Sequence, residues 1–141
     1  MTDIQGAGDL AVRFRNAIEA AATEGRLESH HFDNFPRGAC GPSARILGQY
    51  LQDRGFSVWD YRSGVDADGQ THAWVEQEGW IIDITACQFE DVDEAVVVTK
   101  DDSWHRRFAR MASYPYADLS ADGPALRRDY RLLVTEADAL D

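Results

Sequence analysis

Three residues in the sequence have side chains suited to acyl-transfer chemistry: Cys40, His72 and Asp83. A cysteine thiolate is a strong nucleophile, and imidazole is the side chain whose ordinary pKa suits it to take the thiol proton. A carboxylate on the second ring nitrogen orients the imidazole and stabilises its charged form. The three residue types, in this chain order, predict a Cys-His-Asp catalytic triad.

The residues around Cys40 predict that it lies where a loop becomes a helix. Small residues flank it, and Pro42 follows at a position tolerated in a first helical turn. From Ala44 onward, apolar residues recur at three- and four-residue spacing, as Ile46, Leu47, Tyr50 and Leu51. Gly55 is typical of a helix end. Cys40 is therefore expected at or near the helix N-terminus, where unpaired amides and the helix dipole stabilise a thiolate.

Two strands are predicted to carry the other two residues. Thr71–Gln77 and Trp80–Thr85 alternate as strands do, and Glu78–Gly79 makes a tight turn between them. The resulting antiparallel hairpin brings His72 and Asp83 side by side. Such a contact also explains an aspartate among apolar neighbours, because a buried carboxylate is costly unless it has a partner.

Other residues are candidates for contact with the substrate. Acyl transfer needs two donors for the developing oxyanion. The backbone amide of Cys40 is one natural donor, and either Asn34 or Gln88 is a candidate for the second. Trp74 shares a strand face with His72 and is expected to form a core or pocket wall.

The segment 35–89 resembles the transglutaminase-like branch of the papain-like cysteine enzymes. The resemblance rests on a cysteine at a helix start, a strand reading HAWVE and a strand reading IDIT. Arylamine acetyltransferases and the leader peptidases of lasso-peptide maturation share this broad fold. The resemblance implies a papain-like α+β fold, with an antiparallel sheet packed against an N-terminal helix pair that includes the cysteine helix. It also implies acyl transfer through a thioester at Cys40, His72 and Asp83, and no cofactor.

The rest of the chain fits one domain spanning residues 1–141, with a core over about 9–135. Apolar spacing predicts helices over Asp9–Thr23 and Trp104–Met111. Residues rich in β-formers predict strands over Phe56–Tyr61, Ala95–Thr99 and Asp129–Thr135, and turn residues predict an irregular segment over Ser113–Pro124.

The charge and apolar content of the chain limit the classes of binding partner that are expected. The 141 residues carry a formal net charge of −11, which disfavours phosphate backbones and anionic lipid, so nucleic-acid and membrane binding are not expected. The sequence has no run of the ~20 apolar residues that a membrane span needs, and its N-terminus does not read as a secretory signal. These features predict a cytoplasmic location, with export as an effector left open. The expected partner is a peptide, a protein or a small acyl substrate.

Several alternatives remain open on the sequence alone. Hydrolysis by a peptidase, amidase or deamidase is favoured over transglutaminase- or acetyltransferase-type transfer, and a non-catalytic peptide- or protein-binding member of the same fold is the main rival. A zinc site of Cys40, His72, Cys87 and His31 fits no compact zinc motif. Asp66 with its neighbours fits no calcium loop. No metal is therefore predicted.

Overall fold

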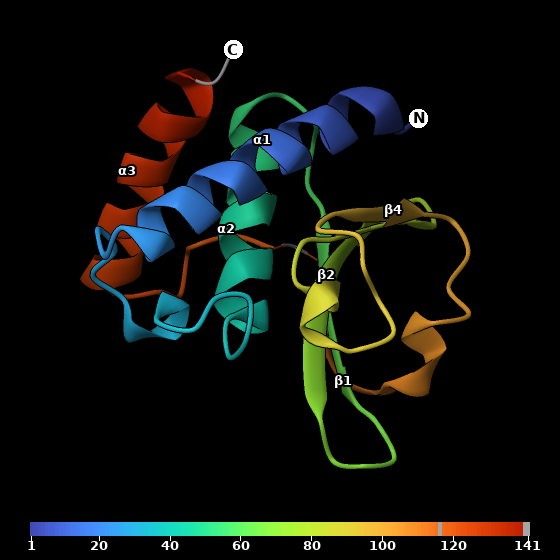
Figure 1. Cartoon of the computed structure of the whole chain (residues 1–141). Helices are drawn as coiled ribbons and strands as arrows, with labels where there is room; N and C mark the ends of the chain where they lie inside the picture. The colour runs from blue at the N-terminus through green and yellow to red at the C-terminus, as the bar shows by residue number, and fades with distance from the viewer. Residues whose placement is uncertain (116, 140–141) are drawn as a thin grey trace.

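The computed structural model describes residues 1–115 and 117–139, apart from the side chains of residues 110–112. Within these residues the chain forms three α-helices, five strands and three 3₁₀ turns (Figure 1). They are α1 (Ile4–Thr23), η1 (His30–Phe32), α2 (Cys40–Asp53), β1 (Asp60–Val65), β2 (Thr71–Gln77), β3 (Trp80–Asp83), η2 (Ala86–Gln88), β4 (Val97–Thr99), η3 (His105–Arg107), β5 (Ala109–Tyr114) and α3 (Pro124–Ala139). None of the described helices is both long and apolar enough to cross a membrane.

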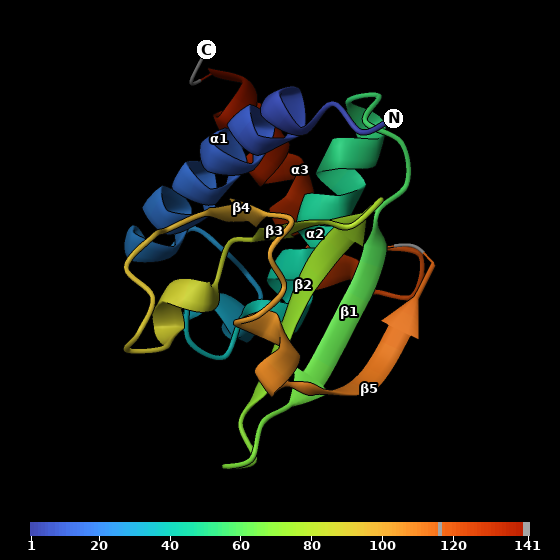
Figure 2. The same ribbon diagram turned by 90° about the vertical axis from the view of Figure 1, so that its right-hand side faces the viewer.

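The strands form one antiparallel sheet in the order β4-β3-β2-β1-β5, which confirms the α+β class. All three helices lie on one face of it (Figures 1 and 2). There α2 packs on β1 and β2, and α1 packs on α3. Phe14 of α1 stacks on Tyr50 of α2 with ring centroids 4.5 Å apart. A smaller second cluster is built from Trp74, Ile81 and Phe108.

The cysteine helix begins and ends where the sequence predicts. Cys40 is the first residue of α2, and Ala39 occupies the N-cap position without any side-chain cap. Gly55 follows the helix with a φ of 86°, and its N–H donates to the carbonyl of Gln52 at 3.1 Å. Because no side chain caps the N-terminus, the amides of the first turn remain available to a negative charge.

The predicted hairpin is present as β2 and β3, with Val75 paired to Ile82. Its turn, Glu78–Gly79, has two positive φ angles of 50° and 82°, as expected for a two-residue type I′ connection. Since the strands run antiparallel, β3 ends at Asp83 toward the end of the sheet where β2 begins and where His72 stands.

The first helix is longer than predicted. It begins at Ile4 instead of Asp9, and Asp3 caps it by accepting the N–H of Gly6 at 3.1 Å. Ala7, which is fully buried, extends the apolar stripe into this added turn. Alanine is a weak hydrophobic signal but the best helix former, so helical propensity adds to burial here.

The strand predicted over Asp129–Thr135 is wrong, because these residues lie in α3. The buried residues of the whole helix recur with helical spacing, as Leu126, Asp129, Tyr130, Leu133 and Ala137. A window of seven residues is too short to distinguish the helical period of apolar residues from that of a strand. Pro124 begins the helix, as its fixed φ allows. The buried Asp129 carboxylate accepts the backbone N–H groups of Glu28 and Ser29 at 2.7 and 2.8 Å, which ties α3 to the connection after α1.

The strand predicted over Phe56–Tyr61 is displaced, because β1 begins at Asp60 and continues to Val65, beyond the predicted end. Ser57 adopts a φ of 67°, which breaks the extended conformation. The carbonyls of Phe56 and Val58 instead accept the side-chain amide of Gln77 at 3.1 and 3.0 Å. A side chain thus replaces the sheet hydrogen bonds of this segment.

The helix predicted over Trp104–Met111 is wrong outside the single turn η3. The chain then forms β5, whose last residues fall in the segment 113–124 predicted to be irregular. Pairing with the open edge of β1 satisfies backbone groups and outweighs the weak local helical pattern. Gly64 permits this approach, since a Cβ there would lie 2.6 Å from the carbonyl oxygen of Ala109.

Gly48 of α2 is predicted to tolerate no side chain. A Cβ at this position would lie 2.2 Å from the carbonyl oxygen and 2.4 Å from the Cβ of Ala117. Gly48→Ala must push this segment away from α2, so we expect a loss of about 1–3 kcal/mol in the free energy of unfolding. Urea denaturation measures it. Gly123→Ala is the matched control, because nothing lies within 4 Å of its added methyl group. Equal stabilities of the two variants would contradict the close packing.

Candidate active site

Cys40 is half-buried at the uncapped start of α2. Its sulfur is among the groups that raise the pKa of His72, although none of the described hydrogen bonds joins the two side chains. It also contributes to the raised pKa of Tyr61, whose largest cause is burial. The structure therefore brings the predicted nucleophile and the predicted base within interaction range of each other.

His72 and Asp83 are in direct contact across the hairpin. His72 Nε2 lies 2.7 Å from Asp83 Oδ2, and both side chains are completely buried. An ionised carboxylate only accepts hydrogen bonds, so Nε2 carries a proton and donates it to Asp83. Nδ1 of His72 is thereby left as the ring nitrogen available for proton exchange.

A second histidine, His105 of η3, contacts the same carboxylate oxygen. Its Nε2 lies 2.7 Å from Asp83 Oδ2, and the side chain is 3% exposed. The other oxygen, Oδ1, accepts the backbone N–H of Thr85 at 3.0 Å. The Asp83 carboxylate thus accepts hydrogen bonds from two imidazoles and one backbone amide, which satisfy this buried group. His105 is not among the residues that the sequence predicts for the site. Its only signal in the sequence is a histidine set between the aromatic residues Trp104 and Phe108.

The cluster separates charge at neutral pH. Burial alone would raise the pKa of Asp83, but the charge and hydrogen bonds of His72 and His105 outweigh it and hold that pKa well below its usual range. Burial would lower the pKa of His72, but the charge and hydrogen bond of Asp83, together with Cys40, raise it to about 9. The arrangement therefore favours an ionised Asp83 and a protonated His72.

Gln88, a predicted oxyanion donor, lies beside the imidazole. Its side-chain nitrogen is 3.1 Å from His72 Nδ1. An amide nitrogen only donates, so in this arrangement Nδ1 is the acceptor. When Nδ1 carries a proton, the amide must turn its oxygen toward the ring or move away. Gln88 also lines a cavity of about 490 Å³, which gives the cluster a polar side facing the surface.

Aromatic rings enclose the imidazole of His72. The rings of Trp74, Phe89, Trp104 and Phe108 have centroids 5.1 to 5.8 Å from it. Trp74, predicted as a core or pocket-wall residue, is 7% exposed and donates Nε1–H to Glu76 at 2.9 Å. Its position is that of a wall behind the histidine. Apolar walls of this kind strengthen the hydrogen bonds they enclose.

The remaining sequence candidates lie elsewhere. Asn34 is exposed and lines a separate cavity of about 540 Å³, which His31 also lines, and none of the described hydrogen bonds joins Asn34 to Cys40. Cys87 is a half-buried free thiol, and Arg15 Nη2 donates to its sulfur at 3.3 Å. Of the two oxyanion candidates, Gln88 alone is thus placed next to the triad residues by a described contact.

One trio of potential metal ligands is present in the described part of the chain: His72, Asp83 and His105, with ligand atoms within 4.8 Å of one another. The zinc set weighed from the sequence, with Cys87 and His31, is not the set that converges. The 2.7 Å contacts from each Nε2 to Oδ2 are hydrogen-bond distances. Ligands of a tetrahedral zinc ion stand roughly 3.3 Å apart. The geometry is that of a hydrogen-bonded cluster.

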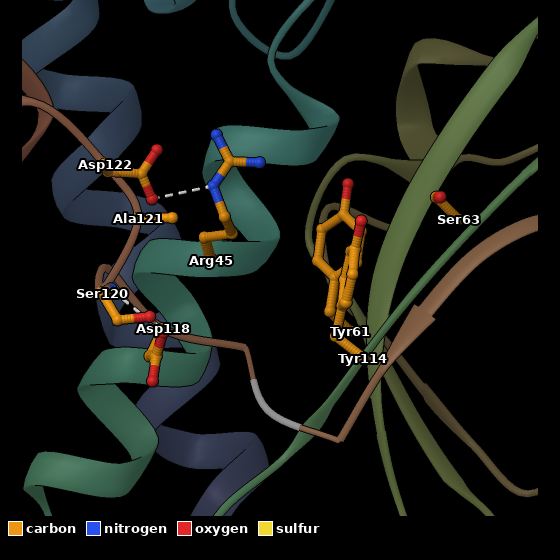
Figure 3. Close-up of a pocket in the computed structure, with 8 residues that line it drawn as sticks. All are labelled: Arg45, Tyr61, Ser63, Tyr114, Asp118, Ser120, Ala121 and Asp122. Atoms are coloured by element: carbon orange, nitrogen blue, oxygen red, sulfur yellow. Dashed lines mark hydrogen bonds and ion pairs between the residues drawn. The ribbon is translucent and has the colours of Figure 1, made fainter.

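A cavity of about 410 Å³ adjoins the start of α2 (Figure 3). Arg45 Nη1 and the hydroxyl of Tyr61 each lie 3.4 Å from the point where a Cβ on Gly41 would stand. Two side chains that line the cavity therefore lie beside Gly41, the residue that follows Cys40, although neither Gly41 nor Cys40 is among the lining residues. Its lining comes from α2, β1, β5 and the segment before α3, as Arg45, Tyr61, Ser63, Tyr114, Asp118, Ser120, Ala121 and Asp122.

The charges of this cavity are largely paired. Arg45 Nε donates to Asp122 Oδ2 at 3.0 Å, as Figure 3 shows. Asp118 is half-buried, and its Oδ1 accepts both the backbone N–H and the hydroxyl of Ser120 at 3.0 and 2.7 Å. The formal charge of the lining is one negative unit, so the cavity suits a neutral or cationic group better than an anion.

Comparisons of the chain with protein-family models, with curated proteins and with solved structures each found no match. The chemistry assigned to the site accordingly depends on the distances, burial and charges of Cys40, His72, Asp83 and their neighbours.

Proposed function

We propose that this protein is a cysteine-dependent acyl-transfer enzyme with Cys40 as nucleophile, His72 as base and Asp83 as the group that orients His72. The observation that carries the proposal is the buried 2.7 Å hydrogen bond between His72 Nε2 and Asp83 Oδ2, close to a cysteine at an uncapped helix N-terminus. Nucleophilic catalysis by a thiol requires this sequence of contacts. Hydrolysis of a peptide or amide bond is the favoured reaction.

The first half of the reaction forms a thioester. The Cys40 thiolate attacks the acyl carbon, so a C–S bond forms and the carbonyl electron pair moves to oxygen. When the tetrahedral intermediate collapses, the C–N bond breaks and His72 Nδ1–H gives its proton to the leaving amine. Asp83 keeps its hydrogen bond to Nε2 throughout and stabilises the imidazolium before this transfer.

The second half regenerates the enzyme. His72, now neutral, takes a proton from water at Nδ1 as the water oxygen attacks the thioester carbon. The C–S bond then breaks and Cys40 leaves as a thiolate beside the imidazolium. An amine in place of water gives acyl transfer by the same steps, so transglutaminase- and acetyltransferase-type reactions are variants of one chemistry.

The oxyanion is assigned to two donors. The backbone N–H of Cys40 belongs to the first turn of α2, where amides have no partner within the helix. The Gln88 amide lies 3.1 Å from His72 Nδ1 and must reorient when that nitrogen is protonated. Its NH₂ group then becomes free to donate to the developing negative charge, which couples oxyanion stabilisation to the protonation of His72.

The fold supports the same proposal. A cysteine at the start of a helix packed on β1 and β2, followed by a histidine on one strand of a hairpin and an aspartate on the next, is the arrangement that the resemblance to transglutaminase-like enzymes implies. We therefore assign the chain to this papain-like fold as part of the proposal. The proposed substrate is a peptide, a protein or a small acyl compound. The 410 Å³ cavity is its proposed binding place, because two of the lining side chains, Arg45 and Tyr61, lie beside the residue that follows Cys40.

One observation favours a second candidate function, a non-catalytic peptide- or protein-binding member of the same fold. Gln88 occupies Nδ1 of His72, which is the nitrogen that the thiol must reach. Complete burial of His72 and Asp83 likewise suits a structural cluster. In that case Cys40 would not turn over an acyl group, although it could still react with small reagents.

Acylation by an activated ester tests the proposal. Incubation with p-nitrophenyl acetate is expected to add one acetyl group to Cys40, seen by intact mass and peptide mapping, and to lose it again on dilution into buffer. Cys40→Ser should remain unmodified and release no burst of nitrophenol. A Cys87→Ser background removes the second free thiol.

The matched variant is His72→Gln, which keeps the shape of the site but supplies no base. Its acetyl-enzyme is expected to form at least tenfold more slowly and to persist. Acetylation of Cys40 at equal rates in the wild type and in His72→Gln would contradict the proposed enzymatic function. The second candidate function, a non-catalytic binding protein, would then describe the chain better.

A further inference from the structure

The proposed mechanism uses one of the two imidazoles that contact Asp83. His105 Nε2 and His72 Nε2 both lie 2.7 Å from the same oxygen, Oδ2. We propose that His105 is a positioning residue of the candidate active site, which holds Asp83 ionised and correctly turned toward His72. This inference depends on the proposed function, because it assigns a role within that same site.

Packing alone does not account for a histidine at this place. His105 is 97% buried between the rings of Trp74 and Trp104, with centroids 4.6 and 4.7 Å away. A phenylalanine would fill such a site without desolvating a polar ring. His105 Nδ1 has no hydrogen-bond partner among the described residues. The contact with Asp83 is therefore the interaction that offsets the burial of this imidazole.

The contact fixes the orientation of the carboxylate. Two imidazoles donate to Oδ2, and the Thr85 amide donates to Oδ1 at 3.0 Å. Rotation of the Asp83 side chain would break all three bonds in a site with no exposed surface. Without His105, His72 would be the only donor on Oδ2, and the carboxylate would be held less tightly in the plane that His72 needs.

Because of this contact, two imidazole donors share the stabilisation of the negative charge on Asp83. His105 lowers the pKa of Asp83 by a hydrogen bond and by charge, so it weakens the attraction of the carboxylate for the proton on His72. Removal of the His105 donor should raise the pKa of His72 above its value of about 9. The imidazolium would then persist to higher pH and give up its proton less readily.

Other charged residues lie near the imidazole rings of His72 and His105. His72 faces Asp83 of β3 and Cys40 of α2. His105 borders two small cavities of about 150 and 220 Å³, each with room for water. The charged residues that line them are Arg62, Glu76, Asp102 and Arg106 on one side and Asp91, Glu94 and Asp101 on the other. Arg62 pairs with Glu76 and Arg106 pairs with Asp102, so the charges of the first cavity cancel. The second cavity is lined by three carboxylates, of which Asp91 pairs with Arg107.

The test compares His105→Phe, which removes the donor, with His105→Gln, whose side-chain amide can still donate to Asp83. The readouts are a ¹⁵N NMR titration of the His72 ring and the pH profile of Cys40 alkylation, both in a Cys87→Ser background. His105→Phe is expected to move the titration of His72, and the alkaline limb of alkylation, upward by roughly one pH unit. His105→Gln should stay close to the wild type.

A measurement on the wild type does not depend on how the variants fold. The ¹⁵N shifts should show that both His72 and His105 carry their proton on Nε2, because each donates to Asp83. A proton on Nδ1 alone of His105 would overturn the inference, as would equal titration shifts in His105→Phe and His105→Gln or no shift in either.

The two proposals fail separately. If the wild type forms the acetyl-enzyme but His105→Phe leaves the His72 titration unchanged, the positioning role of His105 is wrong and the enzyme stands. If Cys40 is never acylated, the enzyme is wrong, and the His72 titration then shows whether His105 still governs the buried pair.

Discussion

Alkylation of Cys40 by iodoacetamide at pH 6 is expected to be fast in the wild type and roughly a hundredfold slower in His72→Ala. Only the thiolate reacts, and an ordinary thiol with a pKa near 8.5 is almost fully protonated at pH 6. In the proposed thiolate–imidazolium pair the thiol proton sits on His72. Burial would lower the pKa of His72, but Asp83 and Cys40 raise it to about 9. Intact mass against time, in a Cys87→Ser background, measures the rate.

The shape of the profile carries as much information as the rate. Because the imidazolium is retained up to about pH 9, the wild-type rate should change little between pH 6 and 8. His72→Ala should instead rise steadily with pH. His30→Ala is the control, since His30 is exposed and contacts Asp33 in a separate segment. An ordinary thiol profile in the wild type, unaffected by the His72 substitution, would mean that no thiolate–imidazolium pair exists.

The sequence was sufficient for those parts of the site that local patterns determine. The apolar stripe and Gly55 define α2, and the I′ turn at Glu78–Gly79 defines the hairpin. The helix places Cys40, and the hairpin places His72 and Asp83. Each follows from short-range rules, and in the hairpin the turn type sets the register between the two strands. The sequence predicts the contact of His72 with Asp83 because the hairpin brings the two strands side by side, and the contact supplies the partner that a buried carboxylate needs.

The parts that were missed depend on contacts distant in the sequence. β5 exists because β1 offers an unpaired edge, and no local pattern in Ala109–Tyr114 shows this. His105 reaches Asp83 from η3, 22 positions further along the chain, so no short window of sequence contains both residues. In α3 the deciding features are the full sixteen-residue period and the bond from Asp129 to the loop before η1, neither of which is visible in a short window.

Asp83→Asn is expected to lower the free energy of unfolding by about 3–5 kcal/mol at pH 6.5, the usual cost of breaking a buried ion pair. The carboxylate accepts from two imidazoles on Oδ2 and from the Thr85 amide on Oδ1. Asparagine has one oxygen, so its NH₂ group must face either the amide or the two ring N–H groups. At least one buried donor is left without an acceptor. Urea denaturation measures the loss, and Asp60→Asn, which removes a partly exposed contact to Arg62, should cost less than about 1 kcal/mol.

The pH dependence of this loss distinguishes a charged pair from simple packing. The pKa of His72 is raised from 6.5 to about 9, so its stabilisation is complete below pH 6.5 and is lost as pH rises through 9. The pKa of Asp83 is depressed, so its stabilisation is present above about pH 4 and is lost in acid. Wild-type stability should therefore fall by up to ~3 kcal/mol between pH 6.5 and 9.

In Asp83→Asn the burial of His72 is no longer opposed by the carboxylate, so the pKa of His72 falls below its ordinary value. Stability of the variant should then rise between pH 5 and 7 instead of falling at alkaline pH. A decline from pH 6.5 to 9 that is equal in both proteins would show that Asp83 does not hold the proton on His72.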